Sequence, residues 1–263
     1  MIDVRAVTKK YGDFAAVDNI SFTVNTGEVF AFLGPNGAGK TTTIKMLTTL
    51  TKPTSGEVFL NGHNVSENPS ATRKSFGIVF QDPSLDNELT AYENMQFHAI
   101  LYGLSKADYE ERIHSLLKLV ELSDRKDQYV KLFSGGMKRR LEIARGLLHQ
   151  PKVLFLDEPT LGLDPQTRKH IWDYVKNLNE KEKVTVFFTT HHMDEVEKMA
   201  ERVAIIDHGK IITIGTLEDI KKKTGMANLE DAFINLTGHE IRDEEGNVGL
   251  SQMRINQKLN MGG

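Results

Sequence analysis

The segment of this sequence that most clearly carries chemistry is a glycine-rich stretch suited to binding phosphate. Residues 34–41 read Gly-Pro-Asn-Gly-Ala-Gly-Lys-Thr and fit the spacing G-x-x-x-x-G-K-[ST]. Backbone N–H groups of such a loop surround a phosphate, and its lysine reaches the terminal oxygens. The hydroxyl that follows is placed to bind Mg²⁺. The motif therefore predicts a nucleotide site made by Gly34, Asn36, Gly37, Gly39, Lys40, Thr41 and Thr42.

Two adjacent carboxylates form the second candidate group. The apolar run 153–156 leads directly into Asp157 and Glu158, and open α/β sheets place their sites at this carboxyl end of the strands. We expect Asp157 to help hold Mg²⁺. We expect Glu158 to orient or deprotonate an attacking water, a role typically worth roughly 10²–10⁴-fold in rate. A solvated strand end is the alternative, but the apolar run and the upstream phosphate loop favour the chemical roles.

A third motif opens a helical pattern that runs to Arg145. It begins with Ser134, Gly135 and Gly136, and serine is a preferred helix N-cap. Two glycines in a first turn cost roughly 1 kcal/mol each relative to alanine. We therefore expect their bare backbone to approach a ligand such as a phosphate.

The elements that must position these residues follow from the hydrophobic pattern. Buried-strand runs alternate with helical patterns, which predicts a parallel sheet flanked by helices; these runs are residues 29–33, 77–80, 153–156, 184–189 and 203–207. Earlier runs at residues 2–7, 20–24 and 57–60 predict an N-terminal antiparallel sheet.

Two helical regions complete this prediction. Residues 89–120 predict a helical insertion, and we expect its apolar face to hold Tyr92, Met95, Phe97, Ile100 and Leu101. A short strand at 211–214 and helices at 217–223 and 229–236 predict a C-terminal lobe.

Composition excludes several classes of protein. The chain has 263 residues, of which 39% are hydrophobic and 26% charged, as in ordinary globular proteins. A formal net charge of −3 gives no basic footprint for nucleic acid. There is no cysteine, so disulfides and thiolate metal sites are excluded. No apolar run approaches the roughly 20 residues of a membrane span, and the first residues lack the features of a secretory signal. We therefore expect a cytoplasmic protein.

Taken together, the motifs resemble those of ABC ATPases, the nucleotide-binding subunits of ABC transporters. The resemblance covers nearly all of residues 1–237. It implies an α/β fold with a P-loop NTPase core, an N-terminal antiparallel β-subdomain and a helical subdomain inserted at about residues 84–150. The C-terminal lobe would span about residues 210–237. The polar composition of residues 238–263 predicts a mobile tail.

The resemblance also implies ATP and Mg²⁺ as ligands and assigns roles to further residues. It implies that Tyr11 stacks on adenine, that Gln81 senses Mg²⁺, and that Ser134, Gly135 and Gly136 grip the γ-phosphate of ATP on a facing subunit. It places Asp164 in a loop that crosses the dimer interface and gives His191, rather than His192, the contact to the γ-phosphate and catalytic water. Taken alone, Tyr11 fits core packing, Gln81 a loop position, and Asp164 a helix N-cap before Pro165.

Finer features resemble drug- and antibiotic-export ATPases of the daunorubicin-resistance type. Residues 133–137 correspond to the signature motif of ABC ATPases, which contains Ser134, Gly135 and Gly136. Within it, Met137 replaces the usual final glutamine and Phe133 replaces a leucine. Residues 189–197 read Thr-Thr-His-His-Met-Asp-Glu-Val-Glu. This resemblance implies a membrane permease partner, which we expect to dock at exposed Leu85 and Leu89, and a position on the inner face of the cell membrane.

A second ATP-binding subunit completes the site, and we expect a homodimer, although a close relative stays possible. A soluble ABC ATPase acting on nucleic acid or ribosomes is the alternative. The single nucleotide-binding motif, the short helical insertion and the absence of a basic excess disfavour it. The basic run 138–140 is expected to be a solvated helix face.

Overall fold

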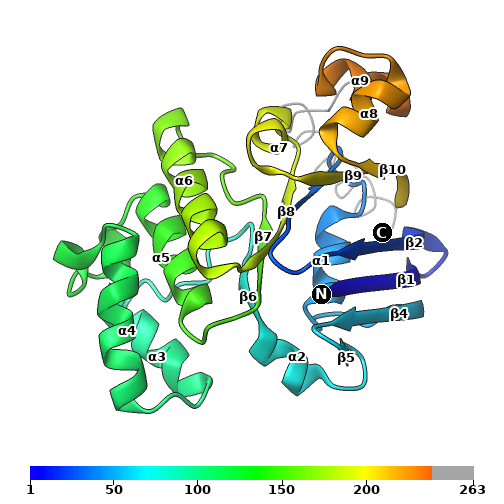
Figure 1. The fold of residues 1–263 in the computed structure, drawn as a ribbon. Helices are drawn as coiled ribbons and strands as arrows, with labels where there is room; N and C mark the ends of the chain where they lie inside the picture. The colour runs from blue at the N-terminus through cyan, green and yellow to red at the C-terminus, as the bar shows by residue number, and fades with distance from the viewer. Residues whose placement is uncertain (239–263) are drawn as a thin grey trace, which may run out of the picture.

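The N-terminal part of the chain forms a four-stranded antiparallel sheet. The computed structural model describes residues 1–238, and the strand order in this sheet is β2-β1-β4-β5 (Figure 1). Its strands are β1 (Ile2–Tyr11), β2 (Phe14–Val24), β4 (Ser55–Leu60) and β5 (His63–Asn64). β1 and β2 continue past the predicted apolar runs because they form a hairpin in which Tyr11 pairs with Phe14 across the turn. The predicted antiparallel sheet is confirmed.

A second sheet has six strands in the order β10-β9-β3-β8-β7-β6. The strands are β3 (Val29–Leu33), β6 (Phe76–Val79), β7 (Val153–Asp157), β8 (Thr185–Thr190), β9 (Arg202–Asp207) and β10 (Lys210–Gly215). Five of them pair in parallel, as predicted, and β10 pairs antiparallel with β9. The strand expected in the C-terminal lobe is therefore the edge strand of the main sheet.

The main sheet is buried on both faces, which explains why its strands are continuous apolar runs. In β3, Phe30 and Phe32 join the core shared with the small sheet, whereas Ala31 and Leu33 join the core on the other face. Helix α1 (Lys40–Leu47) contributes Ile44 and Met46 to the first of these cores. It follows the phosphate loop, so the loop is fixed between a buried strand and a buried helix.

Helices fill the long connection between β6 and β7. They are α3 (Ala91–Leu101), α4 (Lys106–Leu119) and α5 (Gly135–Leu147), with short 3₁₀ turns at Ser123–Arg125 and Val130–Leu132. The remaining helices are α2 (Pro69–Ser75), α6 (Pro165–Glu182), α7 (Met193–Met199), α8 (Leu217–Thr224) and α9 (Leu229–Thr237). The helical insertion and the last two helices are confirmed. Among residues 1–238, no helix combines the length and apolarity needed to cross a membrane.

The apolar face predicted for the insertion is largely wrong. Helix α3 buries Ala91, Met95 and Ala99, four residues apart, whose small or flexible side chains let the helix approach its neighbours closely. The larger Phe97, Ile100 and Leu101 lie on another face and are 58%, 59% and 67% exposed. Because apolar and polar residues are both spread around α3, the sequence pattern did not distinguish its two faces.

Helix α3 also contributes to a ring cluster that makes stability depend on pH. Tyr102, just after α3, stacks on His149 with ring centroids 3.9 Å apart, and His98 lies 4.7 Å from Tyr102. Burial, with the nearby charge of Arg145, lowers the pKa of His98 to about 3. In the unfolded chain a histidine titrates near pH 6.5. His98 is therefore neutral in the folded protein while the unfolded chain takes up a proton below that pH, so acidification favours unfolding.

We expect His98→Phe to flatten the fall in stability between pH 6.5 and pH 5. One such histidine contributes a slope of at most about 1.4 kcal/mol per pH unit, or about 2 kcal/mol over this window. Urea unfolding of both proteins at several pH values measures the difference. His149 and other groups titrate in both proteins, so the difference isolates His98. Parallel curves would show that His98 is not held neutral.

Candidate active site

The phosphate loop joins β3 to α1 with a backbone that glycine alone accommodates. Gly39, the N-cap of α1, has φ of 106°, and a Cβ there would lie 2.6 Å from the Ala16 carbonyl oxygen. A Cβ on Gly34 would lie 2.3 Å from the Ile206 carbonyl oxygen. The absence of a Cβ at these two glycines lets the loop lie directly against neighbouring backbone. In this conformation the backbone amides of the loop can surround a ligand.

The side chain of Lys40 is buried among oxygen acceptors. Its Nζ donates to the carbonyl oxygens of Gly34 at 2.9 Å and Pro35 at 3.2 Å, and lies 3.0 Å from Glu158 Oε1. The other carboxylate oxygen of Glu158 lies 3.1 Å from Nδ1 of His191. Lys40 precedes Glu158 by 118 positions and His191 follows Glu158 by 33, yet the fold gathers the three residues at one end of the main sheet.

Glu158 is held ionised and in a strained conformation. Burial alone would raise its pKa, but the hydrogen bond with His191 and the charge of Lys40 lower the pKa to about 2. The residue has φ of 47°, in the left-handed region, which costs a non-glycine residue about 1–3 kcal/mol. Its N–H donates to Thr189 Oγ1 at 3.0 Å, which fixes this turn. The carboxylate is therefore ionised and paired with both Lys40 and His191.

Asp157 lies beside this cluster and is 1% exposed. Its Oδ1 accepts a hydrogen bond from Thr189 Oγ1 at 2.6 Å and lies 3.4 Å from Thr41 Oγ1. Burial raises the pKa of Asp157, so a cation nearby would stabilise the ionised form. Within residues 1–238, no group of three or more His, Cys, Asp or Glu side chains is arranged so that it could hold a metal ion by itself. The arrangement fits Mg²⁺, which binds through one or two protein oxygens together with substrate phosphates.

A cleft of about 430 Å³ brings most of the predicted binding residues together. It is lined by Tyr11, Phe14, Ala16, Asn36, Gly37, Gly39, Lys40, Thr41, Thr42, Gln81 and Glu158. Tyr11 is 52% exposed, which removes the core-packing alternative for this residue. Phe14 was missed by sequence reasoning, although its place opposite Tyr11 in a hairpin was a usable signal. Two exposed rings at one end and a buried ammonium at the other suit a base and a polyphosphate.

The signature residues and Asp164 lie outside that cleft and form a second group. Ser134 caps α5 by accepting from the Met137 N–H at 3.3 Å, and Asp164 caps α6 by accepting from Gln166 and Thr167. Hydrogen bonds from Thr167 lower the pKa of Asp164. A Cβ on Gly136 would lie 2.4 Å from the Thr167 side chain, so this glycine is also required by packing within the chain. Within this chain, the second group therefore does not line the cleft that holds Lys40 and Glu158.

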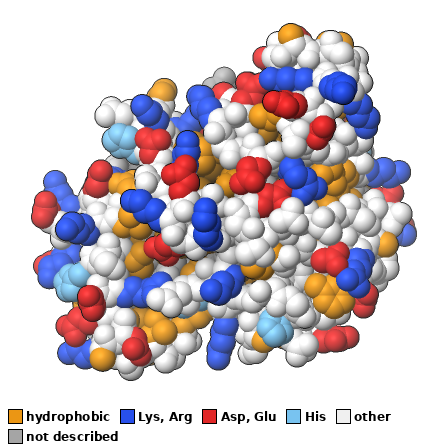
Figure 2. Space-filling view, viewed as in Figure 1, with side chains coloured by type: hydrophobic (Ala, Val, Ile, Leu, Met, Phe, Trp, Pro, Cys, Tyr) orange, Lys and Arg blue, Asp and Glu red, His pale blue; other side chains and the backbone are white. Residues whose placement is uncertain are grey.

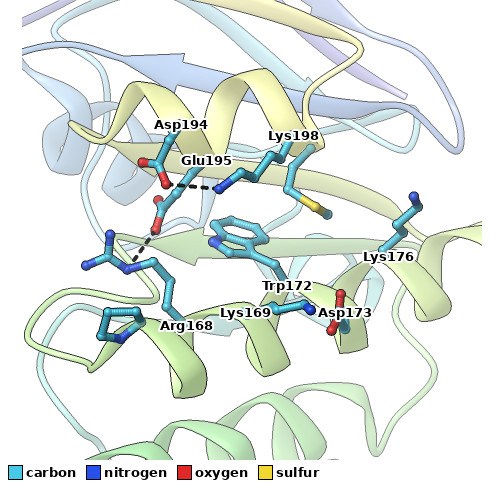
Figure 3. A pocket seen from close by; sticks show the side chains of 10 residues that line it. Arg168, Lys169, Trp172, Asp173, Lys176, Asp194, Glu195 and Lys198 are labelled. Carbon is cyan, nitrogen blue, oxygen red and sulfur yellow. Dashed lines mark hydrogen bonds and ion pairs between the residues drawn. The ribbon is translucent and has the colours of Figure 1, made fainter.

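Sequence reasoning also missed the buried carboxylate of Glu195, four residues after His191. Glu195 of α7 accepts from Thr190 Oγ1 at 2.6 Å and from Thr160 Oγ1, and lies 3.8 Å from Arg168 Nε. Figure 3 shows this ion pair at the edge of a pocket of about 520 Å³ between α6 and α7, with the Trp172 ring between the two helices. Glu195 thus ties the strand end that precedes His191 to the segment that follows Glu158. The neighbouring His192 donates its backbone N–H to Thr190 Oγ1 at 2.9 Å, and the centroid of its ring lies 4.2 Å from that of His191.

Comparisons with known proteins agree with this geometry. The ABC transporter family model matches residues 17–161. The linearmycin resistance ATP-binding protein LnrL of Bacillus subtilis (strain 168) is 41% identical over 237 residues, which cover 90% of this chain and 75% of that protein. The daunorubicin/doxorubicin resistance ATP-binding protein DrrA of Streptomyces peucetius is 42% identical over 224 residues, covering 85% and 68%.

A solved structure extends the comparison to three dimensions. The dimeric structure of a post-hydrolysis state of the ATP-binding cassette MJ0796, bound to ADP and Pi, is similar with a TM-score of 0.75. Its sequence is 30% identical, and the match covers 82% of this chain and 99% of that one. A parallel sheet, a phosphate loop, the strand-end carboxylate pair Asp157 and Glu158, and a helix capped by the Ser134 motif together define an ABC ATPase. The chain belongs to the ABC transporter family, as one of its ATP-binding subunits.

Proposed function

We propose that this chain hydrolyses ATP as one half of a two-subunit sandwich and thereby drives export through a membrane permease. The observation that carries this proposal is that Lys40 and Glu158, which His191 contacts, line one cleft, whereas Ser134 and Gly136 lie outside it. A second subunit, expected to be an identical chain, would bring its signature residues to the first subunit's nucleotide. The dimeric form of the MJ0796 cassette supports this arrangement.

The chain's own groups suggest how the reaction is prepared. When a nucleotide enters, its terminal phosphate competes with Glu158 for the Lys40 ammonium, which lies 3.0 Å from the carboxylate. Released from this ion pair, Glu158 regains basicity and accepts a proton from the attacking water. His191, 3.1 Å from Glu158, orients that carboxylate and contacts the γ-phosphate. Mg²⁺ would be held by Thr41, Asp157 and Gln81, and would neutralise charge that develops on the phosphates.

Export of drugs or antibiotics is the transport function that the relatives favour. Two of them are described as resistance ATP-binding proteins, for linearmycin and for daunorubicin/doxorubicin. We place the protein in the cytoplasm, bound to a permease on the inner face of the cell membrane.

Nucleic acid is not a proposed partner, because Lys and Arg alternate with Asp and Glu on the face drawn in Figure 2 and the net charge is −3. Nothing favours the soluble alternative.

We also propose the following division of the chain. Residues 1–237 form one nucleotide-binding domain, with a helical subdomain at about residues 84–150. The C-terminal lobe would consist of α8 and α9, without β10. The tail proposed for residues 238–263 lies outside the described residues, apart from Gly238.

The expected docking residues need correction. Leu85 is 9% exposed and belongs to the core, and Leu89 is half-buried, so neither offers a docking surface. Phe97, Ile100 and Leu101 of α3 are the exposed apolar residues of this region. Apolar side chains reach the surface in the lower left of Figure 2, over the part of the molecule where Figure 1 places α3. We propose that this α3 patch, made of these three residues, contacts the permease.

We expect Phe97→Asp combined with Leu101→Asp to detach the protein from membranes of cells that also make the permease. A charge on an interface of this kind is costly to bury. ATP hydrolysis by the isolated subunit should not change, because the patch is exposed and remote from the cleft residues. Membrane flotation followed by immunoblotting measures the bound fraction. Leu50→Asp, at a residue 58% exposed, is the matched control. Unchanged flotation of the double variant would reject the α3 patch.

A further inference from the structure

Three charged side chains on one face of α5 hold the loop that carries Gln81. Arg139, Glu142 and Arg145 follow one another at intervals of three residues. The Gln81 loop, residues 80–84, begins directly after β6 ends at Val79. Sequence reasoning had placed Arg139 on a solvated helix face, but it is 6% exposed, and Glu142 is 1% exposed.

Arg139 holds the start of the Gln81 loop with both arms of its guanidinium group. Its Nη2 donates to the Gln81 carbonyl oxygen at 2.9 Å, and its Nη1 donates to the carbonyl oxygen of Phe80. A planar fork with fixed donors suits two consecutive carbonyls, whereas a lysine ammonium is a single point of charge. The Arg139 side chain therefore fixes both the position and the direction of this backbone.

Glu142 and Arg145 hold the other end of the loop. Glu142 Oε1 accepts from the Ser84 N–H at 2.7 Å, while its Oε2 accepts from Arg139 Nη1 at 3.2 Å. Arg145 Nη1 donates to the Ser84 carbonyl oxygen at 2.8 Å. Burial raises the pKa of Glu142, and the Ser84 amide and the Arg139 charge oppose that rise. Charges buried this deeply are tolerated because each one is paired or hydrogen-bonded.

The same helix also carries the signature residues and rests directly on β6. Helix α5 begins at Gly135, with Ser134 as its cap. Farther along, a Cβ on Gly77 of β6 would lie 2.1 Å from the Gly146 carbonyl oxygen, so helix and strand backbones touch. The middle of helix α5 therefore contacts the Gln81 loop, and the N-terminus of the same helix carries the signature residues.

We propose that Arg139 and Glu142 are positioning residues that fix the Gln81 loop to the signature helix, so that the metal-facing amide of Gln81 and the phosphate-facing Ser134 are set together. This inference rests on the proposed role of Gln81 at the Mg²⁺. The two residues act through the loop backbone and do not touch the nucleotide cleft themselves. Loss of groups that orient metal ligands typically lowers metal affinity by about 10- to 100-fold.

The test measures how much Mg²⁺ strengthens nucleotide binding. All proteins carry Glu158→Gln to block hydrolysis, and the fluorescent analogue mant-ATP is titrated once with Mg²⁺ and once with EDTA. We expect Arg139→Met to reduce the gain in affinity due to Mg²⁺ by about 10-fold or more, while binding in EDTA stays unchanged. The gain in affinity for Arg139→Lys should lie between that of Arg139→Met and that of the protein with Arg139 intact. A destabilised protein would instead bind more weakly under both conditions.

Matched variants make each outcome decisive. Arg140→Met is the control, because Arg140 binds the Val120 carbonyl oxygen at 3.1 Å and Glu121, away from the loop. If Arg139→Met fails to fold, Arg139→Met with Glu142→Gln removes both charges and replaces it in the titration. If Gln81→Ala loses the Mg²⁺ gain and the Arg139 variants keep it, the inference is overturned and the proposed function stands. If Gln81→Ala also keeps the gain, the metal role of Gln81 and this inference both fall.

Discussion

Replacing Glu158 with glutamine is expected to lower the rate of ATP hydrolysis by roughly 10²–10⁴-fold, the usual contribution of a general base. The amide keeps the shape of the side chain but has no basic oxygen to take a proton from water. Binding of ATP should survive, because the phosphate loop and the ring pair Tyr11 and Phe14 are untouched. Loss of the negative charge also frees Lys40 from its 3.0 Å ion pair, which leaves the ammonium available to phosphate.

Blocked hydrolysis should hold the two subunits together. Size-exclusion chromatography of Glu158→Gln is therefore expected to show a dimer with ATP and a monomer without it, while phosphate release gives the rate. Glu180→Gln is the matched control, since Glu180 lies on the exposed side of α6, 4.0 Å from Lys176. A variant that hydrolyses ATP at the normal rate would show that Glu158 is not the base. A monomer under every condition would refute the homodimer.

Two inactive variants should restore activity when they are mixed. Lys40→Met removes the phosphate-binding ammonium, and Ser134→Arg blocks the signature, so each homodimer has two defective sites. In a mixed dimer, the intact Lys40 of one subunit faces the intact Ser134 of the other. With random pairing, half of the dimers are mixed and each has one good site of two, so we expect about a quarter of the wild-type rate.

A second mixture controls for the geometry. Lys40 and Glu158 lie on the same side of the split site, 3.0 Å apart, so mixing Lys40→Met with Glu158→Gln leaves every site defective. Steady-state phosphate release from both mixtures, at equal subunit concentrations, provides the comparison. If only the first mixture recovers ATP hydrolysis, misfolding of the variants cannot explain the result. Equal behaviour of the two mixtures would mean that the signature serves its own chain, contrary to the proposal.

The sequence by itself determined those parts of the protein whose structure depends on residues close together in the chain. The phosphate loop, the Asp157–Glu158 pair and the Ser134 cap each depend on a few consecutive residues with an apolar run or a helix beside them. Such patterns fix the backbone wherever the segment lies, so the strand, loop and helix at residues 29–47 were found at their predicted places. The choice of His191 over His192 came instead from the resemblance to ABC ATPases, which place their histidine directly after two threonines, and His191 lies 3.1 Å from Glu158.

Only the tertiary structure decided which side chains face one another across long sequence separations. Apolar residues are spread around α3 rather than gathered on one face, so exposure of Phe97 depended on what packs against the opposite face. Leu85 lies in an irregular loop without periodicity, and its burial follows from the helices around it. The sequence predicted Arg139 to belong to a basic surface run. Its hydrogen-bond acceptors, the carbonyl oxygens of Phe80 and Gln81, lie far from it in sequence and could not be predicted from neighbouring residues. Burial of a charge is decided by its partners, and these come from other parts of the chain.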